Sequence, residues 1–284
     1  MPRTFRAAAL LACLSALPLS AQKLAVAVND GLPISTSTSG AAAWFAILAS
    51  APPTQALPIL GVQFLIRPGG PVQNFALYDQ DPASGKPLNL LASGSFPSVP
   101  HAVWQGGTFA QPVLILPGQT FFVAVDNNDR TWGNQLLPIA VGGVKQTHYW
   151  NTGWSGPFAT QSWAYRLYIP GGAGTMAPYG TGSTGSAGPA ALSGLGWPNT
   201  GNPVGLLARP IAAGAPGVLL LGRFLPGIPA GGLGTLYTFP ILAALPVAAD
   251  PASPFAHQEL RLPNDPFLAG RSEEHTSELQ SPNT

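Results

Sequence analysis

Aromatic side chains crowd into one part of the chain, within about thirty residues of each other. They are Trp132, Tyr149, Trp150, Trp154 and Trp163. The flat C–H faces of sugars pack on aromatic rings, so exposed tryptophans on a β-sheet protein are typical of a carbohydrate-binding surface. We select Trp132, Trp150 and Trp154 as candidate ligand-binding residues. The alternative is that these tryptophans fill the core of a protein that has no disulfides.

Residues for catalysis are sparse and scattered. The stretch GWSGP at residues 153–157 resembles a nucleophile elbow, but its spacing differs from G-x-S-x-G. His101, His148 and His257 are far apart, and none lies in an H-E-x-x-H motif. Glycoside hydrolysis needs two carboxylates beside the scissile bond, for which Asp79 and Asp81 are a formal pair. We therefore expect no enzyme, and an uncharacterised hydrolase whose triad assembles from distant residues is the remaining alternative.

Two short stretches hold several possible oxygen ligands for a metal ion. They are DQDP at residues 79–82 and DNNDR at residues 126–130. Neither has the full spacing of a calcium loop with its closing glutamate. Asx side chains in hairpin loops often bond only their own backbone. We therefore expect both stretches to be turns and the protein to bind no cofactor. Binding of Ca²⁺ is the alternative.

The first 21 residues have the pattern of a secretory signal peptide. Arg3 and Arg6 precede an apolar run over residues 7–17, and a small-residue site follows at Ala21. Cys13, the only cysteine in the chain, lies inside this segment. A lipoprotein site at LLAC, residues 10–13, is the alternative. We expect a secreted or cell-surface protein whose mature chain has neither a disulfide nor a membrane span.

The charge balance argues against two kinds of partner. The chain has 12 Lys and Arg against 11 Asp and Glu, and charged residues make up only 8% of it. Nucleic acid and anionic membrane surfaces attract strongly basic proteins. We therefore expect no nucleic-acid partner, and polysaccharide or cell-surface material is the candidate partner.

Residues 22–170 read as one β-sandwich module. Short apolar runs rich in aromatic and β-branched residues alternate with turns rich in Gly, Pro and Asp. FFVAVD and AYRLYI, at residues 121–126 and 164–169, show the period-two alternation of strands with one wetter face. We expect the side chain of Trp163 to be buried or half-buried in the core. The run AAAWFAILA at residues 41–49 is more typical of a buried strand pair or a single turn than of a helix.

Two hairpins are predicted inside this module. The first joins residues 74–80 to residues 90–94 through the turn DPASGKP. The second covers residues 104–126 and would lie across the sandwich. The fold class is therefore all-β, with antiparallel modules of the β-sandwich or jelly-roll kind.

A Gly-rich break over residues 171–189 separates this module from a smaller second one. Residues 190–270 again show short strand-like runs, many of them beside prolines. Two β modules in series are therefore expected, the second of them truncated.

The second module resembles a small domain found at the C-termini of secreted proteins in planctomycetes and similar bacteria. The resemblance lies in YGTGSTGSAGPAAL, GWPNTGNPVGLLA, GAPGVLLLG and LRLPNDPFLAG, between residues 179 and 270. In that family a cysteine stands where this chain has Ser183. The first module is similar to the jelly-roll-like sandwiches found beside such domains, which bind carbohydrate or space other domains.

The last residues differ from the rest of the chain. Three of its four glutamates lie in RSEEHTSELQSPNT, residues 271–284, which resembles the translation of a sequencing adapter. This resemblance implies a non-native tail. We therefore expect it to lie unpacked or as a detached helix without core contacts.

These observations favour a secreted, non-enzymatic structural or adhesive protein of the extracellular space. A carbohydrate-binding protein that uses exposed tryptophans is the alternative, and an uncharacterised hydrolase is the second alternative.

Overall fold

The structure, a computed structural model, describes the chain from residue 22 to residue 278 with gaps. The described residues are 22–30, 34–35, 44–67, 70–126, 139–140, 147–150, 152–158, 163–171, 184–185, 188–199, 201–229, 235–249, 251, 254–263 and 274–278. Every regular element among them is a β-strand, and all strand pairs are antiparallel, so the all-β prediction is confirmed. No helix in these ranges is long and apolar enough to cross a membrane.

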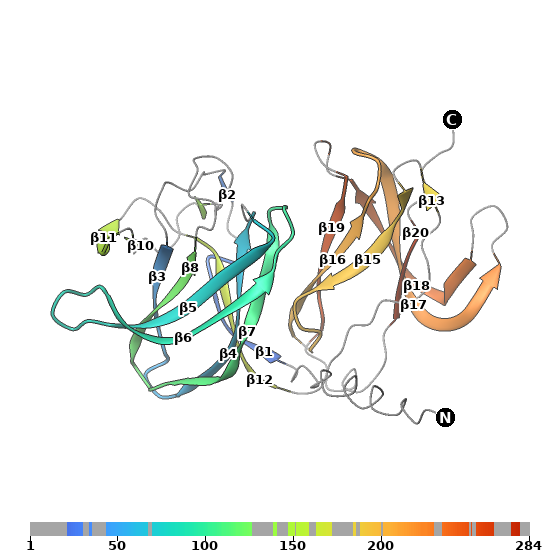
Figure 1. Cartoon of the computed structure of the whole chain (residues 1–284). Helices are drawn as coiled ribbons and strands as arrows, with labels where there is room; N and C mark the ends of the chain where they lie inside the picture. Colours follow the sequence, from blue (N-terminus) through green and yellow to red (C-terminus); the bar gives the residue numbers. More distant parts are fainter. Residues whose placement is uncertain are drawn as a thin grey trace, which may run out of the picture.

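Residues 22–171, the first unit, contain two facing sheets (Figure 1). The four-stranded sheet has the order β1-β12-β4-β7, with strands Gln22–Val28, Tyr165–Pro170, Leu57–Ile66 and Val103–Ile115. The six-stranded sheet has the order β11-β10-β3-β8-β5-β6, with strands Trp154–Phe158, Thr147–Trp150, Trp44–Ser50, Thr120–Asp126, Val72–Gln80 and Pro87–Pro97. The short strands β2, Ile34–Ser35, and β9, Ile139–Ala140, pair with each other.

The space between these two sheets is filled by large apolar side chains. Phe45, Phe75 and Phe121 enter it from the six-stranded sheet, and Phe64 and Leu167 from the four-stranded sheet. Trp163 packs there too and is buried, as its alternation with two buried neighbours predicted. Residues 44–49 of the run at 41–49 belong to β3, a strand with a buried centre, and residues 41–43 lie outside the described residues.

The first predicted hairpin is present, and the second is not. β5 pairs with β6 around the turn at residues 81–86. β7 instead pairs with β4 in one sheet, while β8 pairs with β3 and β5 in the other. The chain therefore crosses from sheet to sheet at residues 116–119, and β7 and β8 do not form a hairpin. Both strands are apolar enough to pair with either sheet, so their partners could not be read from the local pattern.

The strands predicted to have a wetter face are buried on both faces. All six residues from Phe121 to Asp126 of β8 are buried, and so are Arg166 and Tyr168 of β12. The second face of β8 lies under an aromatic cluster, and that of β12 lies under the second unit. The period-two pattern identified the strands correctly. The prediction that one face of each strand is exposed to water was wrong.

Residues 184–278, the second unit, contain two three-stranded sheets. One has the order β15-β16-β19, with strands Ala191–Leu195, Pro203–Arg209 and Ala256–Arg261. The other has the order β18-β17-β20, with strands Thr235–Ala248, Pro216–Pro229 and Glu274–Glu278. Two short strands, β13 at Thr184–Gly185 and β14 at Gly188–Pro189, pair near its start. Most of the predicted linker, residues 172–183, lies outside the described residues.

The expectation of a detached tail or helix at the C-terminus is wrong. Residues 274–278 form β20, which pairs with β17 from Val218 to Gly222 at the edge of a sheet. An open edge presents unpaired backbone N–H and C=O groups, which bond any strand whatever its side chains. The pairing therefore follows from the open edge of β17, which the sequence of the tail does not reveal.

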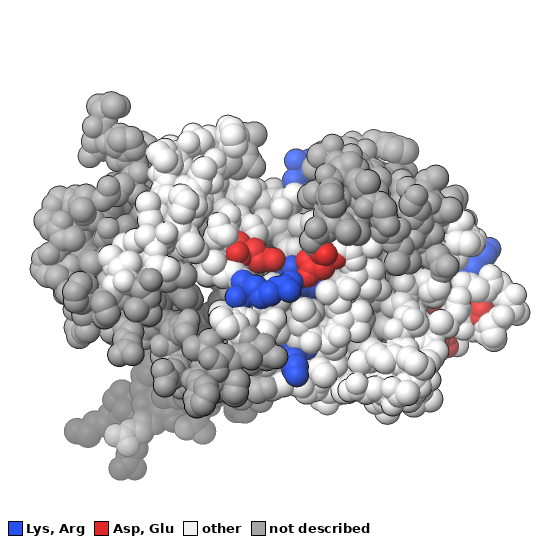
Figure 2. Space-filling model, turned by 180° about the vertical axis from the view of Figure 1, so that it is seen from behind, with Lys and Arg blue, Asp and Glu red and all other residues white. Residues whose placement is uncertain are grey.

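The two units meet through a buried group of charges. The guanidinium of Arg166, on β12, is 1% exposed and donates to both carboxylate oxygens of Asp30 at 2.8 and 3.0 Å. It also donates to both oxygens of Glu259, on β19, at 2.8 and 2.9 Å. Basic and acidic atoms lie side by side near the middle of one face, and most of the other described atoms of that face are uncharged (Figure 2). One arginine thus ties the first unit to the second.

Apolar and aromatic contacts extend this junction. Val99 and Val103 pack with Leu207 and Phe255 of the second unit. The ring of His101 stacks on Phe255 with centroids 3.5 Å apart. The four-stranded sheet of the first unit therefore faces the β15-β16-β19 sheet of the second, so the four larger sheets follow one another along the molecule (Figure 1).

Candidate ligand-binding surface

A row of side chains runs across the outer face of the six-stranded sheet. Trp154 pairs with Trp150, Trp150 pairs with Trp44, and Trp44 pairs with Asp126. Directly paired residues of antiparallel strands point to the same face of a sheet. Three tryptophans from three neighbouring strands therefore lie in line, and the row ends in a carboxylate. We call these four residues the tryptophan row.

Small residues make the floor beside the tryptophan row. Ala46, Ala76 and Ala124 lie side by side on β3, β5 and β8, and each is fully buried. Their methyl groups leave room for larger side chains to reach over them. The rings of Trp154 and Tyr78 meet above this floor, with centroids 5.4 Å apart, although three strands separate β11 from β5.

Trp150 and Trp154 differ in their surroundings. Trp154 is half-buried and packs on the alanine floor, so it supports the surface. Trp150 is 36% exposed, and its ring meets that of Trp154 at 5.4 Å and an angle of 64°. Trp150 is therefore the ring with a face available to a ligand, and Trp154 holds it in place. Trp132 lies outside the described residues.

Sequence reasoning missed Trp44 and Tyr78 as members of this surface. Trp44 begins the alternation of Trp44, Ala46 and Leu48 along β3, a pattern that places them on one face. That signal was present in the sequence. Tyr78 had no such signal, because its contact with Trp154 depends on the strand order of the sheet.

The polar end of the tryptophan row is tightly hydrogen-bonded. Asp126 accepts from the backbone N–H of Asn74 at 2.9 Å and from the Asn74 side chain at 2.6 Å. The side-chain amide of Gln73 also donates to the Asp126 carboxylate. Burial raises the pKa of Asp126, and these hydrogen bonds oppose that rise. The carboxylate therefore serves to join β5 to β8 beside Trp44.

Among the described residues, His148 is an ionisable side chain that lies under the aromatic rings. It is buried, and its ring meets Phe122 edge-on at 4.9 Å. Its Nδ1 is buried and has no hydrogen-bond partner among the described residues. Burial lowers the pKa of His148, and the positive charge of Lys86 lowers it further. A neutral imidazole beneath the rings therefore adds no charge to this surface at neutral pH.

The predicted oxygen-rich stretches lie partly in strands and partly in a turn. Asp79 belongs to β5 and Asp126 to β8, and Asp81 begins the turn between β5 and β6. Asp81 accepts from the backbone N–H of Ala83 at 3.0 Å and from the hydroxyl of Ser84. Asp79 accepts from the backbone and the side chain of Asn89. These bonds hold the β5–β6 turn. Residues 127–130 of the other stretch lie outside the described residues, and no described group of acidic, His or Cys side chains could hold a metal ion.

Two further described histidines, His101 and His257, lie at the junction between the units, whereas His275 lies on β20. His101 stacks on Phe255, and His257 is half-buried on β19 with its Nε2 close to Gly205. Burial lowers the pKa of His257, and the charge of Glu259 partly offsets this effect. Among the described contacts, no histidine is bonded to both a serine and an acidic residue, the arrangement that a hydrolase triad requires.

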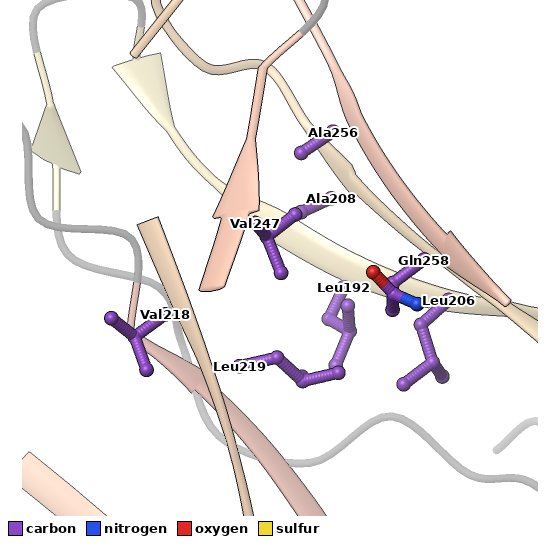
Figure 3. Close-up of a pocket in the computed structure, with 8 residues that line it drawn as sticks. All are labelled: Leu192, Leu206, Ala208, Val218, Leu219, Val247, Ala256 and Gln258. Atoms are coloured by element: carbon purple, nitrogen blue, oxygen red, sulfur yellow. The ribbon is translucent and has the colours of Figure 1, made fainter. Parts of the chain in front are cut away.

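A small apolar pocket lies between the two sheets of the second unit (Figure 3). Its lining residues are Leu192, Leu206, Ala208, Val218, Leu219, Val247, Ala256 and Gln258. Gln258 is the only one with a polar side chain, and it donates to the backbone carbonyl of Glu259 at 3.0 Å. The pocket therefore offers few polar groups to orient a ligand, and the aromatic surface of the first unit is the stronger candidate.

Comparisons with known proteins add no relative from which a function could be transferred. No protein-family model matches the chain, and no curated protein is significantly similar to it.

Proposed function

We propose that the protein is a secreted, non-enzymatic structural or adhesive protein whose adhesive surface is the outer face of the six-stranded sheet. The ligand is carbohydrate, either a polysaccharide or the glycans of a cell surface. The single observation that carries this proposal is the exposed ring of Trp150, which Trp154 and Trp44 flank in one row.

Sugar recognition suits the chemistry of this surface. An aromatic face gives apolar contact to the C–H groups of a sugar ring, and it does so with little loss of side-chain freedom. Asn74 lies next to Asp126 beyond the end of the row, and it is exposed. Its amide supplies the donor and acceptor groups that sugar hydroxyls require. Adhesion to glycans needs no catalytic group and agrees with the expected extracellular location.

The rigid junction supports the structural part of the proposal. An arginine that forms bidentate bonds to two carboxylates fixes both the distance and the angle between the two units, because the guanidinium is planar. An adhesive protein under tension benefits when its two units hold one orientation. The hydrolase alternative has no arrangement of described residues in its favour, and we do not propose it.

Retention on immobilised polysaccharides tests the proposal. A panel should include cellulose, chitin, an α-glucan and an acidic polysaccharide, with the full chain and its Trp150→Ala variant. We expect at least one polysaccharide to retain the chain, and Trp150→Ala to weaken that retention about tenfold or more, as for a central aromatic contact.

Two control variants separate binding from folding. Leu114→Ala removes an apolar side chain that is even more exposed, at 61%, from β7 in the other sheet, and should leave retention unchanged. Trp150→Tyr keeps an aromatic face and should keep most of the affinity. The proposal fails if no polysaccharide retains the chain, or if Trp150→Ala is retained as well as the parent while its thermal unfolding is unchanged.

A further inference from the structure

The hairpin of β10 and β11 lies at one end of the six-stranded sheet. β10 pairs with β3 on one side and with β11 on the other, and no described strand lies beyond β11. The two strands are only four and five residues long, and their register shifts between Thr147 and Tyr149. A short pair at the end of a sheet has few bonds to break, so it can loosen while the rest of the sandwich stays folded. Trp150 and Trp154 both lie on this hairpin.

His148 is buried where the hairpin joins the sheet. It is 2% exposed, it pairs with Ala46 of β3, and its ring meets that of Phe122 of β8 edge-on. It also forms a hydrogen bond with the backbone of Ser155 on β11. One imidazole therefore lies among three other strands and helps to hold the hairpin in place.

The Nδ1 atom of His148 has no acceptor for a second proton. It is buried and has no hydrogen-bond partner among the described residues. The bond to Ser155 is therefore made by Nε2, which carries the single proton of the neutral ring. A proton added in acid goes to Nδ1, and it creates a buried N–H without an acceptor and a positive charge beneath the aromatic rings. Both are unfavourable until water reaches the ring.

The ionisable side chains around His148 do not compensate such a charge. Lys86, just before β6, is positive and repels it. Tyr78 of β5 is neutral, because burial raises its pKa, and Tyr149 of β10 points to the opposite face. Asp126 of β8 is already held by two side chains of β5. The described residues of β3 and β11 include no ionisable side chain.

We propose that His148 is a pH-sensitive positioning residue of the tryptophan row, whose protonation loosens the β10–β11 hairpin, separates Trp150 and Trp154 from Trp44, and releases the ligand in acid. This inference rests on the proposed function, because it concerns the regulation of the same surface. The ligand binds the packed, neutral hairpin, and the proton binds the loosened one more tightly. Each therefore weakens the binding of the other.

The direction of the pKa shift sets the pH range. Burial lowers the pKa of His148 in the packed hairpin and Lys86 lowers it further, whereas a histidine in water has a pKa of about 6.5. The packed form thus has its full stability above about pH 6.5 and loses it as the pH falls below that value. Uptake of one proton shifts the balance by at most about thirtyfold between pH 7.5 and pH 5. Asp126 acts in the opposite sense, because its raised pKa favours the packed form in acid.

Retention at two pH values tests the release of the ligand. The probe is the polysaccharide of the panel above that retains the full chain most strongly. We expect its affinity to fall about fivefold or more from pH 7.5 to pH 5, and His148→Gln, which cannot titrate, to bind equally at both. His257→Gln is the matched control, because it removes another histidine with a lowered pKa, at the junction between the units, and should keep the fall. An equal fall with His148→Gln, or a fall below about twofold in the parent, overturns the proposal.

Tryptophan fluorescence without a ligand separates this proposal from the proposed function. The emission should change with a midpoint below about pH 6.5 in the parent and in His257→Gln. The change should be absent from His148→Gln and from Trp150→Phe combined with Trp154→Phe. His148→Phe keeps a planar ring and replaces His148→Gln if that variant does not fold. If no polysaccharide retains the chain but this change is present, the proposed function fails while the switch in the hairpin stands. A parent without the change overturns the switch.

Discussion

At the scale of single residues, Arg166 is the most unusual side chain. It is 1% exposed, and its guanidinium lies 3.8 Å from the centroid of the Trp104 ring in addition to its two carboxylate partners. Burial alone would lower the pKa of Arg166, but the hydrogen bonds and charges of Glu259 and Asp30 outweigh that effect and raise it. The positive charge is therefore compensated in the folded state, and its removal leaves two carboxylates facing each other.

Replacement of Arg166 should therefore be costly. We expect Arg166→Met to lower the free energy of unfolding by about 3 kcal/mol, the lower end for a broken buried pair, because both carboxylates keep some contact with water. Urea unfolding measures this loss. Arg261→Met is the control, since Arg261 is 67% exposed and lies 3.6 Å from Asp30. It should cost less than about 1 kcal/mol.

A compensating variant shows whether the loss of stability in Arg166→Met comes from unpaired charges or from lost packing on Trp104. If the loss comes from two unpaired carboxylates, Asp30→Asn together with Glu259→Gln should restore part of the stability of Arg166→Met. No recovery would mean that the contact with Trp104, rather than the charge pairing, carries the effect.

At the scale of elements, an edge can accept a strand without any matching sequence. β20 pairs with five consecutive residues of β17, yet its sequence EHTSE lacks a large apolar side chain. Its bonds to β17 are backbone bonds at the edge of a three-stranded sheet. Such a strand contributes less to stability than a central strand, which also fills a core.

Removal of residues 271–284 should therefore leave the rest of the chain folded. We expect the midpoint of thermal unfolding to fall by less than about 5 °C, which corresponds to a loss of at most 1–2 kcal/mol. Differential scanning calorimetry of the full chain and of residues 1–270 gives this comparison. A shift above about 10 °C, or loss of the transition, would show that β20 is an integral part of the second unit.

At the scale of the whole molecule, the two units share one continuous packed interface. The backbone N–H of Leu24 donates to the side chain of Asn202 at 2.8 Å, and Tyr168 packs against Trp197 with ring centroids 4.5 Å apart. These contacts join the Arg166 group and the cluster around Phe255. A junction with a buried charge pair and an apolar cluster favours joint unfolding over independent unfolding.

Tryptophan fluorescence and far-ultraviolet circular dichroism should therefore report one coincident urea transition. Phe255→Ala removes the ring that His101 stacks on, and we expect it to separate the transitions of the two units. Phe109→Ala is the control, because Phe109 lies in the core of the first unit and away from the junction. It should lower the midpoint by a similar amount and keep one transition. Separate transitions in the unchanged chain would contradict a shared interface.

Part of this architecture was predictable from the sequence alone. Alternating apolar and polar residues, with Gly, Pro and Asp between them, identified most of the strands of the first unit, the turn between β5 and β6, and the burial of Trp163. Trp150 and Trp154 were selected as exposed candidates, and they pair across the short hairpin of β10 and β11, where Trp150 is exposed and Trp154 is half-buried. Local patterns carry this information because the period of side chains along a strand depends only on the backbone.

The sequence thus determined the all-β class of this protein, the placing of most of its strands and turns, and the region richest in tryptophan. Tertiary structure alone decided which strands are neighbours, and with them the row of Trp44, Trp150 and Trp154. It also decided that Arg166 and Tyr168, the polar side of β12, face a second unit and not water. The physical reason is that strand pairing joins residues far apart in the chain through backbone groups that every sequence shares, so neighbours are chosen by the packing of whole faces.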